Sequence, residues 1–76
     1  MFDMPDLYSA KTVLKALKKA GFEKVSQKGS HIKLRRTFKR KVITVIVPDH
    51  KMIAKGTFSS ILRQADMSKD EFERNL

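Results

Sequence analysis

The sequence predicts an α+β domain made of a helix, a three-stranded antiparallel sheet, a second helix and a short C-terminal helix. Two observations predict this class. Apolar residues recur at helical spacing near both ends of the chain, whereas apolar and polar residues alternate in the middle. Since 76 residues allow one small core, we expect residues 1–76 to form a single domain.

The first helix is predicted to begin at Ser9, because a serine hydroxyl can accept a hydrogen bond from a free N–H of the first turn. Its apolar residues recur every three or four positions, at Ala10, Val13, Leu14 and Leu17. Gly21 is expected to end the helix, since glycine readily adopts the left-handed backbone of a C-terminal cap.

Three strands are predicted at residues 22–27, 30–38 and 42–47, joined by a turn at 28–29 and a cationic connection at 39–41. Successive side chains of a strand point to opposite faces of its sheet. In the second strand, Ile32 and Leu34 therefore share one face. His31, Lys33 and Arg35 share the other face. We expect the helices to cover the apolar face and to leave the basic face open to ligands.

The second helix is predicted to begin at residues 56–57 with Thr57 as its cap, after a turn at residues 48–51. Its apolar stripe consists of Phe58, Ile61, Leu62 and Ala65. Ser68 and Glu71 are three residues apart, which is typical of the start of a helix. This last helix is expected to hold Phe72 and to reach Leu76.

The charge of the chain is strongly positive and unevenly distributed. Seventeen lysines and arginines against eight aspartates and glutamates give a formal net charge of +9. The cations crowd residues 11–41, while most acidic residues lie near the ends of the chain. Such a surface is typical of proteins that bind nucleic-acid phosphates. Anionic lipid is a weaker alternative, because the apolar face of the first helix is needed for the core.

Several functional classes are excluded by what the sequence lacks. It has no cysteine, so it has neither disulfides nor thiolate sites. Its longest apolar run, residues 42–47, is too short to span a bilayer, and no signal peptide is evident, so a cytoplasmic protein is expected. Two histidines with Asp49 as the one nearby carboxylate do not form a convincing metal-ligand set.

The tripeptide Gly29-Ser30-His31 precedes the basic face of the second strand. RNA carries its own nucleophile, the 2′-hydroxyl, so a neutral histidine can act as the general base for its cleavage. We assign this role to His31, with Lys33 and Arg35 holding phosphates and Lys28 as a weaker candidate. The alternatives are a solvated strand face and a histidine that is only one more phosphate contact.

His50 is the second histidine of the chain, in the turn after the third strand. It is interpreted first as a turn residue. An acid–base pair with His31 stays open as an alternative, because the start of one strand and the end of its antiparallel partner lie at the same end of the sheet. The sequence does not identify the general acid. A noncatalytic RNA-binding module and a structural subunit that binds an acidic protein are the two alternative functions.

The chain resembles the HicA-type toxins of bacterial and archaeal toxin–antitoxin systems over nearly its whole length. The matching segments, in order, are LKALKKAGF at 14–22, GSH at 29–31, VPDH at 47–50, KGTFSSILRQA at 55–65 and MSKDEF at 67–72. Two departures are a short extension at residues 1–7 and Asp66, where the family often has glycine.

This resemblance implies a double-stranded RNA-binding-like fold and an mRNA interferase, an endoribonuclease that blocks translation and growth without a cofactor. It implies that His31 is the catalytic histidine and that Gly29 and Ser30 match the motif residues before it. It also implies a HicB-like antitoxin that covers the toxin, with oligomerisation through that partner. Ile46, or another apolar side chain of the third strand, is expected to be partly exposed for this contact.

Overall fold

The computed structural model describes residues 7–76, and the predicted extension at residues 1–7 lies almost entirely outside them. Its elements are α1 (Ala10–Lys19), β1 (Glu23–Lys28), β2 (His31–Phe38), β3 (Lys41–Pro48), α2 (Lys55–Ala65) and α3 (Lys69–Arg74). This order confirms the predicted α+β class, and each strand end lies within one residue of the predicted one. No helix among residues 7–76 is long and apolar enough to cross a membrane.

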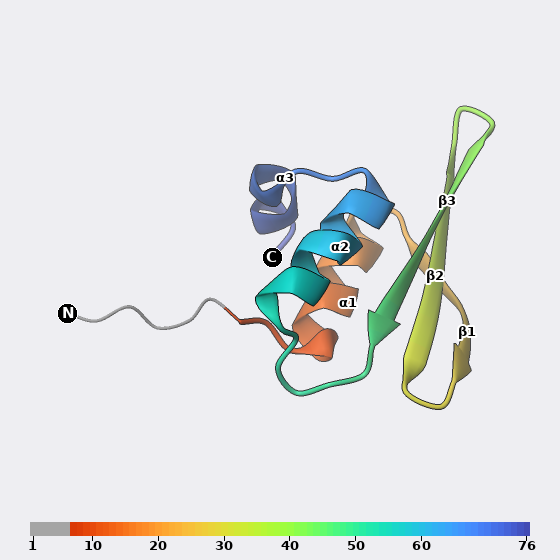
Figure 1. Cartoon of the computed structure of the whole chain (residues 1–76). Coiled ribbons are helices and arrows are strands. Elements are labelled where there is room, and N and C mark those ends of the chain that lie inside the picture. The colour runs from red at the N-terminus through yellow and green to blue at the C-terminus, as the bar shows by residue number, and fades with distance from the viewer. Residues whose placement is uncertain (1–6) are drawn as a thin grey trace.

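The sheet has the order β1-β2-β3 with both pairs antiparallel. Helices α1 and α2 lie on one side of it, and the other side of the sheet is bare (Figure 1). Ile32 and Leu34 are buried under the helices, as predicted. In β3, Val45 and Val47 are buried whereas Ile46 is exposed, which settles the orientation that the sequence left open.

Helix α1 begins and ends as predicted. Ser9 Oγ accepts a hydrogen bond from the backbone N–H of Thr12 at 3.1 Å. At the other end, Gly21 has a φ of +104° and donates its N–H to the carbonyl of Lys18, while Phe22 donates to the carbonyl of Leu17. These two bonds form a Schellman motif, and they direct the chain from the helix into β1.

The predicted start of helix α2 is wrong. Ala54 is the cap residue and Thr57 lies within the first turn, and no side chain caps this end. The other end of α2 explains the family's glycine: Asp66 adopts a left-handed backbone with a φ of +55°. Glycine adopts this conformation without steric cost, and aspartate is one of the few other residues that tolerate it.

Helix α3 closes one side of the core. Ser68 Oγ accepts the N–H of Glu71 at 3.1 Å, which confirms Ser68 as its cap. Phe72 is buried and packs against Tyr8 and Phe58, with ring centres 5.2 and 4.9 Å away. The helix ends at Arg74, so the expectation that it reaches Leu76 is wrong. Leu76 lies beyond the helix and is 48% exposed.

The two hairpin turns differ from each other in backbone chemistry. The first turn consists of Gly29 and Ser30 rather than the predicted residues 28–29, since Lys28 pairs with His31. Gly29 has a φ of +59°, as expected for the first position of a type II′ turn. In the second turn, Lys39 and Arg40 have φ values of +51° and +67°, although neither is a glycine. Positive values at both positions are the pattern of a type I′ turn.

The second turn generates a stability prediction. Replacing Arg40 with glycine is expected to raise the free energy of unfolding by about 1 kcal/mol, because a left-handed backbone costs most L-residues about 1–2 kcal/mol and the entropy of glycine offsets part of the gain. Urea denaturation measures the change. As the opposite control, Gly29→Ala should lower the free energy of unfolding, because a positive φ is unfavourable for alanine. A Cβ at this position meets no atom within 4 Å, so no steric clash adds to this backbone cost. A less stable Arg40→Gly protein would contradict this account of the turn.

Candidate functional site

His31 is the first residue of β2 and lies on the bare face of the sheet. It pairs with Lys28 of β1 on one side and with Pro48 of β3 on the other. Beyond this row, the N–H of Asp49 donates to the carbonyl of Ser30 at 2.7 Å and ties the end of β3 to the first turn. The backbone around His31 is therefore held by both neighbouring strands, while its side chain is exposed.

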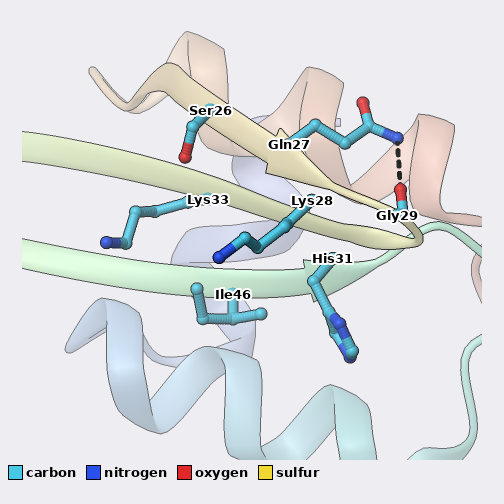
Figure 2. A pocket seen from close by; sticks show the side chains of 7 residues that line it. All are labelled: Ser26, Gln27, Lys28, Gly29, His31, Lys33 and Ile46. Atoms are coloured by element: carbon cyan, nitrogen blue, oxygen red, sulfur yellow. Dashed lines mark hydrogen bonds between the residues drawn. The ribbon is translucent and has the colours of Figure 1, made fainter.

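A shallow hollow of about 680 Å³ lies on this face, lined by Ser26, Gln27, Lys28, Gly29, His31, Lys33 and Ile46. Figure 2 shows His31 near the first turn, with Lys28 and Lys33 extending over the same face. Four of the six predicted site residues thus lie together, namely Lys28, Gly29, His31 and Lys33. The hollow is open to solvent and has the size of a small-ligand site.

The other two predicted residues lie outside the lining of this hollow. Ser30 is the second residue of the turn, and its carbonyl is used by Asp49. Arg35 is exposed two positions beyond Lys33, with Glu23 and Thr44 opposite it on the neighbouring strands. Arg35 therefore continues the basic row of β2 past the hollow instead of contributing to it.

Three lining residues were not predicted as site residues. Ser26 lies opposite Lys33 because the register of β1 shifts between Lys24 and Ser26, and no sequence pattern announces such a bulge. The Gln27 side chain donates to the carbonyl of Gly29 at 3.1 Å and braces the turn (Figure 2). Ile46 was expected only to be exposed. The polar Thr44, two residues earlier, marks this face of β3 and is the signal that places Ile46 on it.

A second depression, of about 490 Å³, adjoins the first and contains both histidines. Its lining residues are His31, Ile46, Pro48, His50, Met52, Ile53, Ala54, Thr57 and Gln64. It therefore lies between the end of β3 and the first turns of α2, on the side to which the His31 ring points in Figure 2. The expectation that the hairpin brings the two histidines to one end of the sheet is met.

The edge of β3 beside this depression is closed by α2. The backbone N–H of Ile46 donates to Gln64 Oε1 at 2.9 Å, and Gln64 Nε2 donates to Ser60 Oγ at 3.3 Å. A side chain of the helix thus satisfies a strand N–H that β2 does not pair, which protects the edge from other strands. The contact also fixes α2 relative to the row that carries Ile46 and Lys33.

Positive charge dominates around the site, although the exposed Asp49 lies at its edge, where its backbone is tied to Ser30. Residues 24–48 contain eight lysines and arginines and no aspartate or glutamate. At the far end of β2, Arg36 and Lys39 lie 5.1 and 5.4 Å from the ring centre of the half-exposed Phe38. Within residues 7–76, no three His, Asp or Glu side chains gather as metal ligands. The bare face thus presents cations and an imidazole, a combination that suits a phosphate ligand.

Comparison with known proteins gives a family for the chain. The family model for the HicA toxin of bacterial toxin–antitoxin systems matches residues 10–67, from the start of α1 to just beyond the end of α2. No curated protein matches the chain. The match covers well over half of the sequence and includes the residues that line both depressions. A toxin of a toxin–antitoxin system has an antitoxin as its partner. The chain therefore belongs to the family of HicA toxins of bacterial toxin–antitoxin systems.

Proposed function

We propose that this toxin is an endoribonuclease that cleaves mRNA in the cytoplasm, stops translation and growth, and is neutralised by a HicB-like antitoxin. The observation that carries the proposal is the place of His31, exposed on a bare sheet face between Lys28 and Lys33. An exposed imidazole among cations can move a proton on a bound polyanion. The absence of acidic residues from 24 to 48 favours a phosphate backbone as that polyanion.

In the proposed reaction, His31 takes the proton of a ribose 2′-hydroxyl. The 2′-oxygen attacks the adjacent phosphorus, the bond from phosphorus to the 5′-oxygen breaks, and the departing oxygen takes up a proton. The products are a 2′,3′-cyclic phosphate and a 5′-hydroxyl. Negative charge accumulates on the phosphate oxygens in the transition state. Lys28 and Lys33 line the same hollow as His31, so their ammonium groups can stabilise this charge.

The alternative function is a noncatalytic RNA-binding module in which His31 is one more phosphate contact. The same exposed, basic face supports it, because phosphate contacts alone give affinity without chemistry. The two functions differ in what the loss of the His31 imidazole changes: an enzyme loses rate, whereas a binding module loses only affinity.

The first prediction separates these functions. His31→Ala should lower the rate of RNA cleavage by about 10²- to 10⁴-fold and abolish growth arrest, because one general base contributes about that much. RNA affinity should stay within a few-fold of the wild-type value, since phosphate contacts dominate it. Single-turnover cleavage and filter binding measure the two quantities. Thr37→Ala, at an exposed position of the same strand, is the matched control. Full cleavage by a pure, folded His31→Ala protein would exclude the proposed base.

The second prediction concerns the basic row of β2. Lys33→Ala and Arg35→Ala should each weaken the binding of unrelated RNA sequences and reduce the slope of log affinity against log salt by about one unit. Lys33 should also affect the cleavage rate, because it lines the hollow with His31 while Arg35 does not. Unchanged salt slopes in both variants would place the RNA elsewhere, toward the cations at residues 39–41.

The third prediction concerns the antitoxin. We expect it to cover the face that carries His31, with acidic or carbonyl groups on Lys33 and Arg35 and an apolar contact on Ile46, which is 36% exposed. The antitoxin and RNA should then compete. Titrating the antitoxin into a toxin–RNA complex, with the RNA fluorescently labelled, measures the displacement. A ternary complex with undiminished RNA affinity would show that the antitoxin acts from a remote site.

A further inference from the structure

The backbone of His50 is held at a fixed place although it lies outside the helices and strands. Its N–H donates to the carbonyl of Pro48, and its own carbonyl accepts the N–H of Ala10 at the start of α1, both at 2.9 Å. The preceding residue, Asp49, is tied to Ser30. Three hydrogen bonds therefore anchor this short segment to β3, to α1 and to the turn before His31. The His50 side chain is exposed and free to meet a ligand.

The register of β2 and β3 places His50 at the end of the sheet where His31 lies. Pro48 lies directly opposite His31 in the β2–β3 pair, and His50 follows two residues later. Both imidazoles line the depression between β3 and α2. The other lining residues are Ile46, Pro48, Met52, Ile53, Ala54, Thr57 and Gln64, none of which exchanges a proton near neutral pH. If His31 is the base, His50 is thus the one side chain of residues 7–76 in this depression that can act as the general acid.

We propose that His50 is the general acid of the cleavage reaction, an inference that rests on the endoribonuclease function proposed above. As His31 accepts the 2′-hydroxyl proton and the 2′-oxygen bonds to phosphorus, the bond to the 5′-oxygen breaks, and the protonated His50 gives its proton to that oxygen. The products are a 2′,3′-cyclic phosphate and a 5′-hydroxyl. Each turnover leaves His31 protonated and His50 neutral, and exchange with water restores both.

A substrate with a better leaving group tests this role directly. In an RNA whose scissile 5′-oxygen is replaced by sulfur, the leaving group is a thiolate. A thiol has a pKa of about 8.5, far below that of an alcohol, so the thiolate departs without a proton from an acid. The loss of a general acid is therefore repaired by the sulfur substrate, whereas the loss of a general base is not.

The experiment measures single-turnover cleavage of the oxygen and sulfur RNAs by wild-type toxin, His50→Ala and His31→Ala. We expect His50→Ala to cleave the oxygen RNA about 10²- to 10⁴-fold more slowly than the wild type, and the sulfur RNA within a few-fold of it. His31→Ala should be slow on both RNAs. Lys51→Ala, an exposed neighbour that does not line this depression, is the matched control and should behave as the wild type. His50→Gln keeps a polar side chain of similar length and serves if His50→Ala unfolds, as judged by circular dichroism.

The outcomes separate this inference from the proposed function. Wild-type rates for His50→Ala on the oxygen RNA, or equal losses on both RNAs, would overturn the general-acid role while the reaction at His31 stands. Rescue of His31→Ala by sulfur would also overturn it, because the roles would be reversed. If the wild-type toxin cleaves neither RNA, the endoribonuclease function itself fails.

Discussion

The register of β2 against its two neighbours is the constraint on which the site depends. Side chains alternate along a strand, so burying Ile32 and Leu34 under the helices places His31 and Lys33 on the bare face. A slip of one residue would bury the cations and expose the core. The fold secures this register with an anchored turn before His31, where Gln27 braces Gly29 and Asp49 holds Ser30.

The same constraint joins two parts of the chain that are distant in sequence. Because β2 and β3 are antiparallel, the start of one lies beside the end of the other, and His50 lies nineteen positions beyond His31 yet lines the same depression. Helix α2 completes this depression and is fixed to β3 through Gln64 and the N–H of Ile46. One surface of this small protein thus gathers two imidazoles and a basic row. An open site of this kind suits the long RNA that we propose as the substrate, since its backbone can run across the face.

Much of this arrangement could be predicted from local sequence patterns. The buried pair in β2, the caps at Ser9 and Ser68 and the left-handed Gly21 follow from local rules that tertiary packing did not override. These rules place His31 and Lys33 on one face, and the family motif singles out His31. The placement of both histidines in one depression was left open by the sequence, because it depends on where α1 and α2 hold the segment after β3.

Other features could not be read from the sequence for identifiable physical reasons. Thr57 has the chemistry of a cap, yet the helix extends one turn further toward its start and needs no side-chain cap. The bulge between Lys24 and Ser26 changes the register of β1 and places Ser26 opposite Lys33. No reliable local sequence pattern predicts such a bulge. In β3, the residues at 42–47 are apolar except for Thr44, so a single polar residue marks the exposed face that also carries Ile46.

The central claim is that the RNA supplies its own nucleophile to a histidine site. The most direct measurement maps the cleavage position in excess EDTA, determines the ends of both fragments by mass spectrometry, and repeats the assay with a single 2′-deoxy sugar at that position. The account predicts a 5′-hydroxyl on the downstream fragment, phosphate retained on the upstream fragment, and no cleavage of the deoxy substrate. A 5′-phosphate on the downstream fragment, or cleavage at the deoxy position, would show that water attacks instead and would contradict the account.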